Sequence, residues 1–113
     1  MNNIIVDKSF SFAVRIVNVY KHLTQLQKEY VMSRQLLRCG TSIGANIVEA
    51  QRGQSKADFR AKMSIALKEA NETDYWIRLL YKTEYLNDTQ YESLIADIQE
   101  ILSILIAICK TLE

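Results

Sequence analysis

Apolar and polar residues alternate along this chain with the period of an α-helix. Between Ser55 and Tyr85 the core-type positions recur every three or four residues, so they lie on one face of a helix. Three other segments show the same spacing, and the pattern predicts four amphipathic helices, over residues 8–25, 29–52, 55–85 and 88–112. The buried stripe predicted for the first of them comprises Phe12, Ile16, Val17, Tyr20 and Leu23.

Residues typical of helix ends mark these boundaries. Asp7 is expected to cap the first helix, which leaves residues 1–6 as a short tail with some β-propensity. Ser55 and Asn87 are suitable caps for the third and fourth helices. The chain has no proline and only three glycines, so few residues interrupt a helix. Four such helices with short connections predict an all-α fold, an antiparallel up-down four-helix bundle.

Two of the glycines, Gly40 and Gly44, fall inside the second predicted helix. Each costs about 1 kcal/mol relative to alanine in a helix, and their spacing places them on the same face. We therefore expect close helix packing at both positions. An alternative is a break in the chain here, with Thr41 or Ser42 capping a new helix. The local pattern leaves both interpretations open.

Length and composition predict a single domain, residues 1–113, of the soluble globular class. The chain is 49% hydrophobic and 24% charged. Its longest apolar run, Ile101 to Cys109, is too short to span a bilayer, so no membrane partner is expected. The N-terminal sequence does not have the pattern of a signal peptide. Cys39 and Cys109 both lie in apolar patterns, which indicates buried thiols and a cytoplasmic location.

The residues from Leu37 to Ala50 resemble a family signature, Arg-x-x-x-Ser-Ile-x-x-Asn-Ile-x-Glu. The signature is that of the bacterial four-helix-bundle proteins, also called 23S rRNA intervening-sequence proteins. Ser55-x-x-Asp58-Phe59 and the segment from Ile65 to Trp76 are similar to the third helix of that family. The resemblance covers residues 8–111, although the Phe-Pro pair usual between the first two helices is missing here.

This resemblance implies a four-helix bundle whose second helix continues through Gly40 and Gly44. It also implies a ring-shaped homo-oligomer, a homopentamer. Relatives include the accessory variability determinant of diversity-generating retroelements, a basic protein that works with a reverse transcriptase and nucleic acid. Many other members have no known function. The partners that the resemblance implies are therefore further copies of the chain and nucleic acid or a nucleic-acid-processing protein.

No pattern in the sequence favours catalysis. A di-iron carboxylate bundle needs Glu-x-x-His on two helices, and the only histidine, His22, has Val19 three residues before it. Neither Ser42 nor Cys39 has a histidine nearby in sequence to act as its base. We therefore expect no enzyme activity, no cofactor and no metal. The carboxylates are instead predicted to form a structural polar network against Arg38, Arg52 or Arg60, with these members: Asn46, Glu49, Glu69 and Glu72.

Charge is distributed unevenly along the chain. Residues 1–62 hold ten Lys/Arg and four Asp/Glu, a net +6, whereas residues 63–113 hold four and nine, a net −5. The balance fits two complementary halves, or a basic surface on the second and third helices for nucleic acid. The candidate contacts of that surface are Arg34, Arg38, Arg52, Lys56, Arg60 and Lys62.

The last predicted helix is apolar on more than one side. Ile95, Ile101, Ile106 and Ile108 widen its stripe, so a second face is expected to meet another subunit. Taken together, the sequence favours a non-enzymatic, ring-forming scaffold or adaptor protein. The alternative is an accessory protein that binds RNA or DNA directly through the basic surface.

Overall fold

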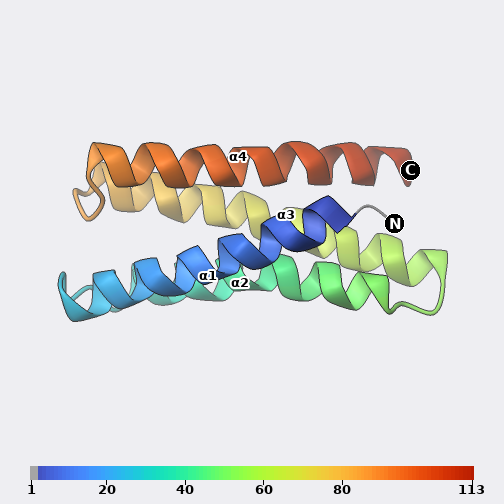
Figure 1. Ribbon diagram of the computed structural model, residues 1–113, viewed down its shortest axis with the longest axis horizontal. Coiled ribbons are helices and arrows are strands. Elements are labelled where there is room, and N and C mark those ends of the chain that lie inside the picture. The colour runs from blue at the N-terminus through green and yellow to red at the C-terminus, as the bar shows by residue number, and fades with distance from the viewer. Residues whose placement is uncertain (1–2) are drawn as a thin grey trace.

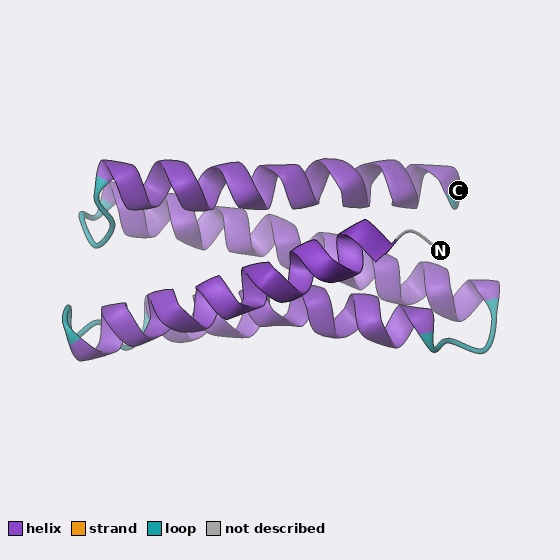
Figure 2. Ribbon diagram, viewed as in Figure 1, coloured by secondary structure: helices purple, strands orange, loops and turns teal. Residues whose placement is uncertain are grey.

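The computed structural model describes residues 3–113 and confirms an all-α four-helix bundle (Figure 1). Consecutive helices run antiparallel, and short loops join them at the two ends of an elongated molecule of 44 × 20 × 19 Å (Figure 2). The helices are α1 (Asn3–Gln25), α2 (Met32–Gln51), α3 (Lys56–Lys82) and α4 (Asp88–Thr111).

The helices follow one another around the bundle, so that α1 packs on α2, α2 on α3 and α3 on α4. The fourth side, between α1 and α4, is the loosest, and two ion pairs cross it. Arg15 lies 2.5 Å from Asp97, and Lys8 lies 2.9 Å from Glu100. All four helices contribute to one apolar core, whose largest fully buried side chains are Ile5, Ile16, Leu23, Leu36, Ile43, Ile47, Met63, Ile77, Leu80, Leu94, Ile98 and Ile101.

Helix α2 runs without a break through both of its glycines, as the continuous interpretation predicted. A Cβ atom on Gly40 would lie 2.9 Å from the Ile16 side chain of α1, and one on Gly44 would lie 3.3 Å from the Ser9 carbonyl oxygen. The Thr41 and Ser42 hydroxyls do not cap a new helix, because each donates to a carbonyl one turn earlier in α2. The glycines therefore let α1 approach α2 closely.

The prediction of a non-helical tail at residues 1–6 was wrong for residues 3–6. Helix α1 already includes residues from Asn3 onward, and Asp7 lies inside it rather than at its cap. Met1 and Asn2 lie outside the described residues. The physical reason is burial: Ile5 is fully buried and extends the stripe of Phe12 by two turns, so packing overrides its β-propensity.

Helix α2 begins at Met32, three residues later than predicted, and the side chain of Glu29 binds the N–H groups at its start. The Glu29 carboxylate accepts hydrogen bonds from the backbone N–H groups of Val31, Met32 and Ser33, at 3.1, 3.0 and 2.7 Å. It thereby satisfies N–H groups that have no partner within the helix, and it places a negative charge at the positive end of the helix dipole.

Helix α3 ends at Lys82, three residues earlier than predicted. The Tyr85 N–H reaches back to the Leu80 carbonyl at 2.9 Å, and Glu84 between them adopts a left-handed conformation with φ 72°. This is a Schellman motif, which closes a helix. The other two caps are confirmed: Ser55 accepts from the Asp58 N–H at 3.1 Å, and Asn87 forms a capping box with Gln90.

Candidate functional site

The side between α2 and α3 carries a polar network centred on Arg38. Its guanidinium pairs with Glu69 at 3.4 Å and makes a short contact with Glu72, both on α3. Glu72 also accepts a hydrogen bond of 3.1 Å from the Trp76 indole. The Arg38 side chain is 48% exposed, so the network lies at the surface and ties two helices in register.

The other two members predicted for that network lie elsewhere. Asn46 donates to the Ser42 carbonyl of its own helix at 2.8 Å. Glu49 is exposed and pairs with Lys62 of α3 at 3.3 Å. The structure thus brings Arg38, Glu69 and Glu72 together and separates them from Asn46 and Glu49.

The residues considered for nucleophilic chemistry were Cys39, Thr41, Ser42 and His22. Cys39 is fully buried, and burial raises the pKa of its thiol to about 11. His22 lies near the end of α1, whereas Thr41 and Ser42 lie in the middle of α2. Among residues 3–113, no three His, Cys, Asp or Glu residues are grouped as a metal site would require.

The six candidate basic residues do not form one surface. Arg38 and Lys62 are engaged in the ion pairs just described. Arg34 lies in the first turn of α2 and is about 27 Å from Arg52 along the helix axis, at 1.5 Å per residue. The remaining free cations cluster around the α2–α3 loop, and none has an ion pair with another described residue: Arg52, Lys56 and Arg60.

An apolar surface that the sequence did not predict covers the outer side of the α1–α2 pair. We call it the α1/α2 face, and it comprises Phe10, Val14, Val17, Ala45 and Val48. Phe10 is 69% exposed and Val14 is 49% exposed. A mostly apolar groove of about 460 Å³ runs beneath it, with Gly44 in its floor. Exposed apolar groups collected in one place are typical of a contact surface.

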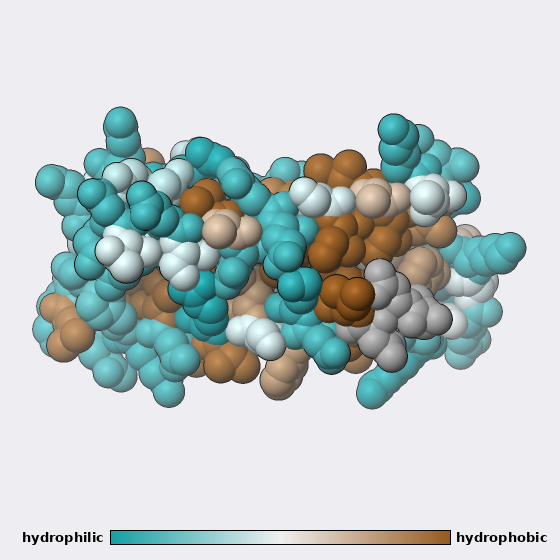
Figure 3. Space-filling view, turned by 45° about the horizontal axis from the view of Figure 1, so that its top comes forward, coloured by the Kyte–Doolittle hydropathy of each residue, from teal (hydrophilic) through white to brown (hydrophobic). Residues whose placement is uncertain are grey.

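A second apolar surface lies on the C-terminal half of α4. We call it the α4 face, and it comprises exposed Ile106 with half-buried Leu102 and Cys109, which are spaced by four and three residues and so share one side of the helix. Figure 3 shows apolar residues gathered toward the end of the molecule that carries the C-terminus. Ile101, which the sequence assigned to this surface, is buried in the core instead. Despite its apolar character, α4 cannot cross a bilayer, and neither can any other helix within residues 3–113.

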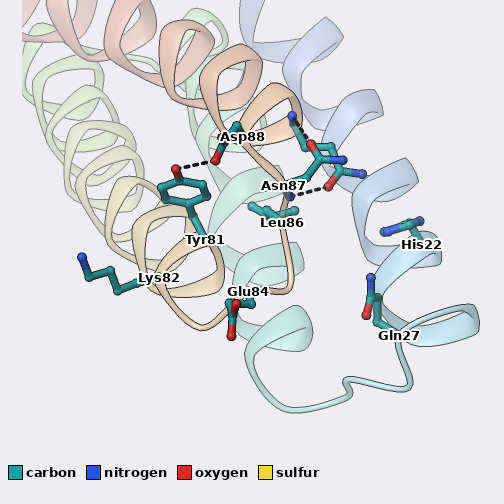
Figure 4. Close-up of a pocket in the computed structure, with 9 residues that line it drawn as sticks. His22, Gln27, Tyr81, Lys82, Glu84, Leu86, Asn87 and Asp88 are labelled. Carbon is teal, nitrogen blue, oxygen red and sulfur yellow. Dashed lines mark hydrogen bonds between the residues drawn. The ribbon is translucent and has the colours of Figure 1, made fainter.

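A cleft of about 680 Å³ opens at the end of the bundle where the α1–α2 and α3–α4 loops meet. His22 and Gln27 line one side, and Lys82 and Glu84 line the other (Figure 4). The second loop is held by the Tyr81 hydroxyl, which donates to Asp88 at 2.7 Å. The cleft thus lies between two ordered loops of different sequence.

Two features of the structure had a signal in the sequence that we did not recognise: the exposed apolar side of α1 and the role of Glu29. Val17 was assigned to the core stripe, but it is 36% exposed because it lies about 100° around α1 from Ile16. Phe10 and Val14, four residues apart, already formed a second stripe. Glu29 also had a signal, because it lies three residues before Met32, but the rules for N-caps consider only the residue next to the helix, which is Val31 here.

Comparison with known proteins identifies one protein family that the chain matches. Residues 1–107 match the family model of the 23S rRNA-intervening sequence protein. A solved structure from Bacteroides thetaiotaomicron, of a protein with unknown function from the S23 ribosomal protein family, is 61% identical. The match covers 95% of this chain and 99% of that one, with a TM-score of 0.93. No curated protein matches the chain.

Proposed function

The chain belongs to the 23S rRNA-intervening sequence protein family, and from this we propose that it is a non-enzymatic scaffold that assembles with copies of itself into a ring. The observation that carries the proposal is the presence of two separate exposed apolar surfaces, the α1/α2 face and the α4 face. The exposed members of the two surfaces, Phe10, Val14, Val17 and Ile106, are not part of the core. Each surface is suited to be covered by another protein surface.

The position of the two faces supports a ring rather than a simple dimer. They lie on different helices, one on α1 and α2 and the other on α4. When one face of a subunit packs on the other face of the next, the contact is head-to-tail, and repetition closes a ring if the rotation allows. Five copies, the number that the family resemblance implies, are the proposed assembly.

The experiment is the solution mass measured by light scattering behind a sizing column. One subunit is 13.1 kDa, so a ring of five has a mass about five times larger. Phe10→Ser/Val14→Ser should reduce the mass to that of a monomer, and so should Ile106→Ser, because each removes one half of the head-to-tail contact.

Tyr75→Ser is the matched control, since Tyr75 is 57% exposed on α3 and belongs to neither face. Its mass should equal that of the unaltered chain. A monomer at every concentration of the unaltered chain contradicts the proposal. Retention of the full mass by both face variants does so as well.

A second function, direct binding of RNA or DNA, has one specific observation in its favour. Arg52, Lys56 and Arg60 gather at the α2–α3 loop without partners among the described residues, and Lys56 and Arg60 border a cleft there. A ring would repeat this cluster in each subunit and add avidity. Arg52→Glu/Arg60→Glu should abolish the salt-dependent binding of an RNA oligonucleotide. Arg38→Glu tests whether a predicted residue outside this cluster also contributes to the binding. Absence of binding at low salt contradicts this function.

The cytoplasm is the compartment that fits the proposed scaffold. Both cysteines are free, one buried and one half-buried, which suits a reducing environment. The partners proposed for the ring are nucleic acid or a protein that processes it.

A further inference from the structure

We infer that the α1–α2 loop is a docking point for an acidic, amphipathic segment of a partner protein. The loop presents Leu26, Tyr30 and Val31 to solvent, with 73%, 51% and 74% of their surfaces exposed. Leu26 and Val31 are the most exposed large apolar side chains in the described chain. This inference goes beyond self-assembly, because the loop belongs to neither the α1/α2 face nor the α4 face.

The loop is held rigidly in the conformation that exposes these side chains. Glu29, only 8% exposed, accepts three backbone N–H bonds from the start of α2, and its own N–H donates to the Leu23 carbonyl at 2.9 Å. The Ser33 hydroxyl donates to the Glu29 carbonyl at 2.8 Å. A surface that is already ordered loses little conformational entropy when a partner binds.

The charges around the loop select a partner of negative charge. Lys21, Lys28 and Arg34 are exposed and have no ion pair with any described residue. The only carboxylate of the loop, Glu29, is turned inward to the helix N-terminus. Lys28 also holds a left-handed conformation, φ 58°, in which glycine is more favourable, so the loop keeps a cation at a position of backbone strain.

The opposite loop carries charges of both signs, with Lys82 beside Glu84 on its side of the cleft. Glu84 of the α3–α4 loop is also left-handed and exposed, and it lies across the cleft from Gln27 (Figure 4). A bound acidic segment therefore places its carboxylates toward Lys28 and Arg34 rather than toward Glu84 and Asp88.

The chemistry favours a protein segment over the other two classes of partner. Nucleic acid has phosphates for the cations and a base for Tyr30, but it has no apolar surface to cover Leu26 and Val31. A membrane surface would contact three cations and a few apolar side chains, and these together form only a weak and reversible anchor. An amphipathic segment satisfies both the apolar and the basic groups.

The test uses two fluorescein-labelled synthetic helical peptides, identical in their leucine stripe, with glutamates in one and lysines in the other. By fluorescence anisotropy, the full chain should bind the acidic peptide at least about tenfold more tightly than the basic one. Leu26→Ser/Val31→Ser should weaken that binding about tenfold, and Lys28→Glu/Arg34→Glu should invert the preference. Tyr75→Ser and Lys68→Glu, remote on α3, are the matched controls.

Two further measurements separate the outcomes. Phe10→Ser/Val14→Ser, which tests assembly, should leave binding of this monovalent peptide unchanged, so failure of the ring does not remove the docking site. Equal binding of the two peptides, or an equal loss in the control variants, would overturn the inference. Loop-dependent binding of phosphatidylglycerol vesicles or of an RNA oligonucleotide, without binding of the acidic peptide, would also overturn it.

Discussion

Helix α2 makes different kinds of contact with its two neighbouring helices, α1 and α3. Toward α1 the contact is apolar and close, with Gly40 against Ile16 and Gly44 against the backbone of Ser9. Toward α3 the outer contact is ionic, with Arg38 between two glutamates and Lys62 on Glu49. The apolar side therefore depends on shape, and the ionic side depends on charge at a solvated surface.

This difference assigns separate roles to the two sides. Close packing fixes the distance between α1 and α2, and it creates the groove under the α1/α2 face. The ion pairs on the other side contribute less energy, because they are partly exposed, but they favour one register of α2 on α3. Substitutions on the apolar side should thus cost more than substitutions on the ionic side.

The largest effect is expected at Gly44. Gly44→Val adds a side chain 3.3 Å from a backbone oxygen that cannot rotate away, so the free energy of unfolding should fall by about 1–3 kcal/mol. Urea unfolding measures it. Ala61→Val, at an exposed position of α3, is the control and should cost only about 0.5 kcal/mol. Equal losses in the two variants would show that α1 and α2 are not closely packed.

The next effect concerns Glu29, at the connection between α1 and α2. Burial by itself raises the pKa of Glu29, but the N–H groups of Ser33, Met32 and Val31 together outweigh it and lower the pKa below the usual 4.5. The stabilisation is therefore present above pH 4.5 and is lost as the pH falls through the lowered value. Glu29→Gln should lower the free energy of unfolding at pH 7 by about 1 kcal/mol.

The control for this prediction is the free energy of unfolding of both chains measured as a function of pH. Because acid acts on the whole chain, the unaltered chain and Glu29→Gln are compared at each pH. The gap between the two curves should close in acid. A gap that stays constant would mean that the charge of Glu29 does not cap α2.

A smaller effect is expected on the ionic side, at Arg38. Arg38→Met should lower the free energy of unfolding by about 0.5–1 kcal/mol, because the guanidinium is half exposed but meets two carboxylates. A double-mutant cycle with Glu72→Gln should show that the two losses are not additive. Additive losses would show that the pair does not interact in solution.

The smallest effect is expected at the second ion pair. The side chains of Lys62 and Glu49 are 38% and 60% exposed, so Lys62→Met should change the free energy of unfolding by no more than about 0.5 kcal/mol. The same urea titration measures it, before and after addition of salt. A loss as large as that of Gly44→Val would contradict the distinction between the two sides.

The sequence predicted the elements that depend on local pattern. The four helices, the continuity of α2 and the caps Ser55 and Asn87 follow from spacing, residue type and family resemblance, and the structure confirms them. The start of α1 was wrong because the burial of Ile5 is a tertiary effect. Local rules for helix ends do not include such contacts.

The candidate surfaces could be predicted only in part, for a geometric reason. Helical spacing identifies which residues share a face, but it does not tell which neighbouring helix each half of the face meets. Glu49 and Glu69 therefore looked like one cluster, although they have different partners in Lys62 and Arg38. Val17 likewise looked like core because only the position of α2 decides how much of α1 remains exposed.

The central claim is that the α1/α2 face holds copies of the chain together. Its most direct test is the urea midpoint of unfolding as a function of protein concentration. Association stabilises the folded state by mass action, so the midpoint of the unaltered chain should rise with concentration. That of Phe10→Ser/Val14→Ser should stay constant at the value of the isolated subunit. A midpoint of the unaltered chain that does not change over about a hundredfold range of concentration would contradict the claim.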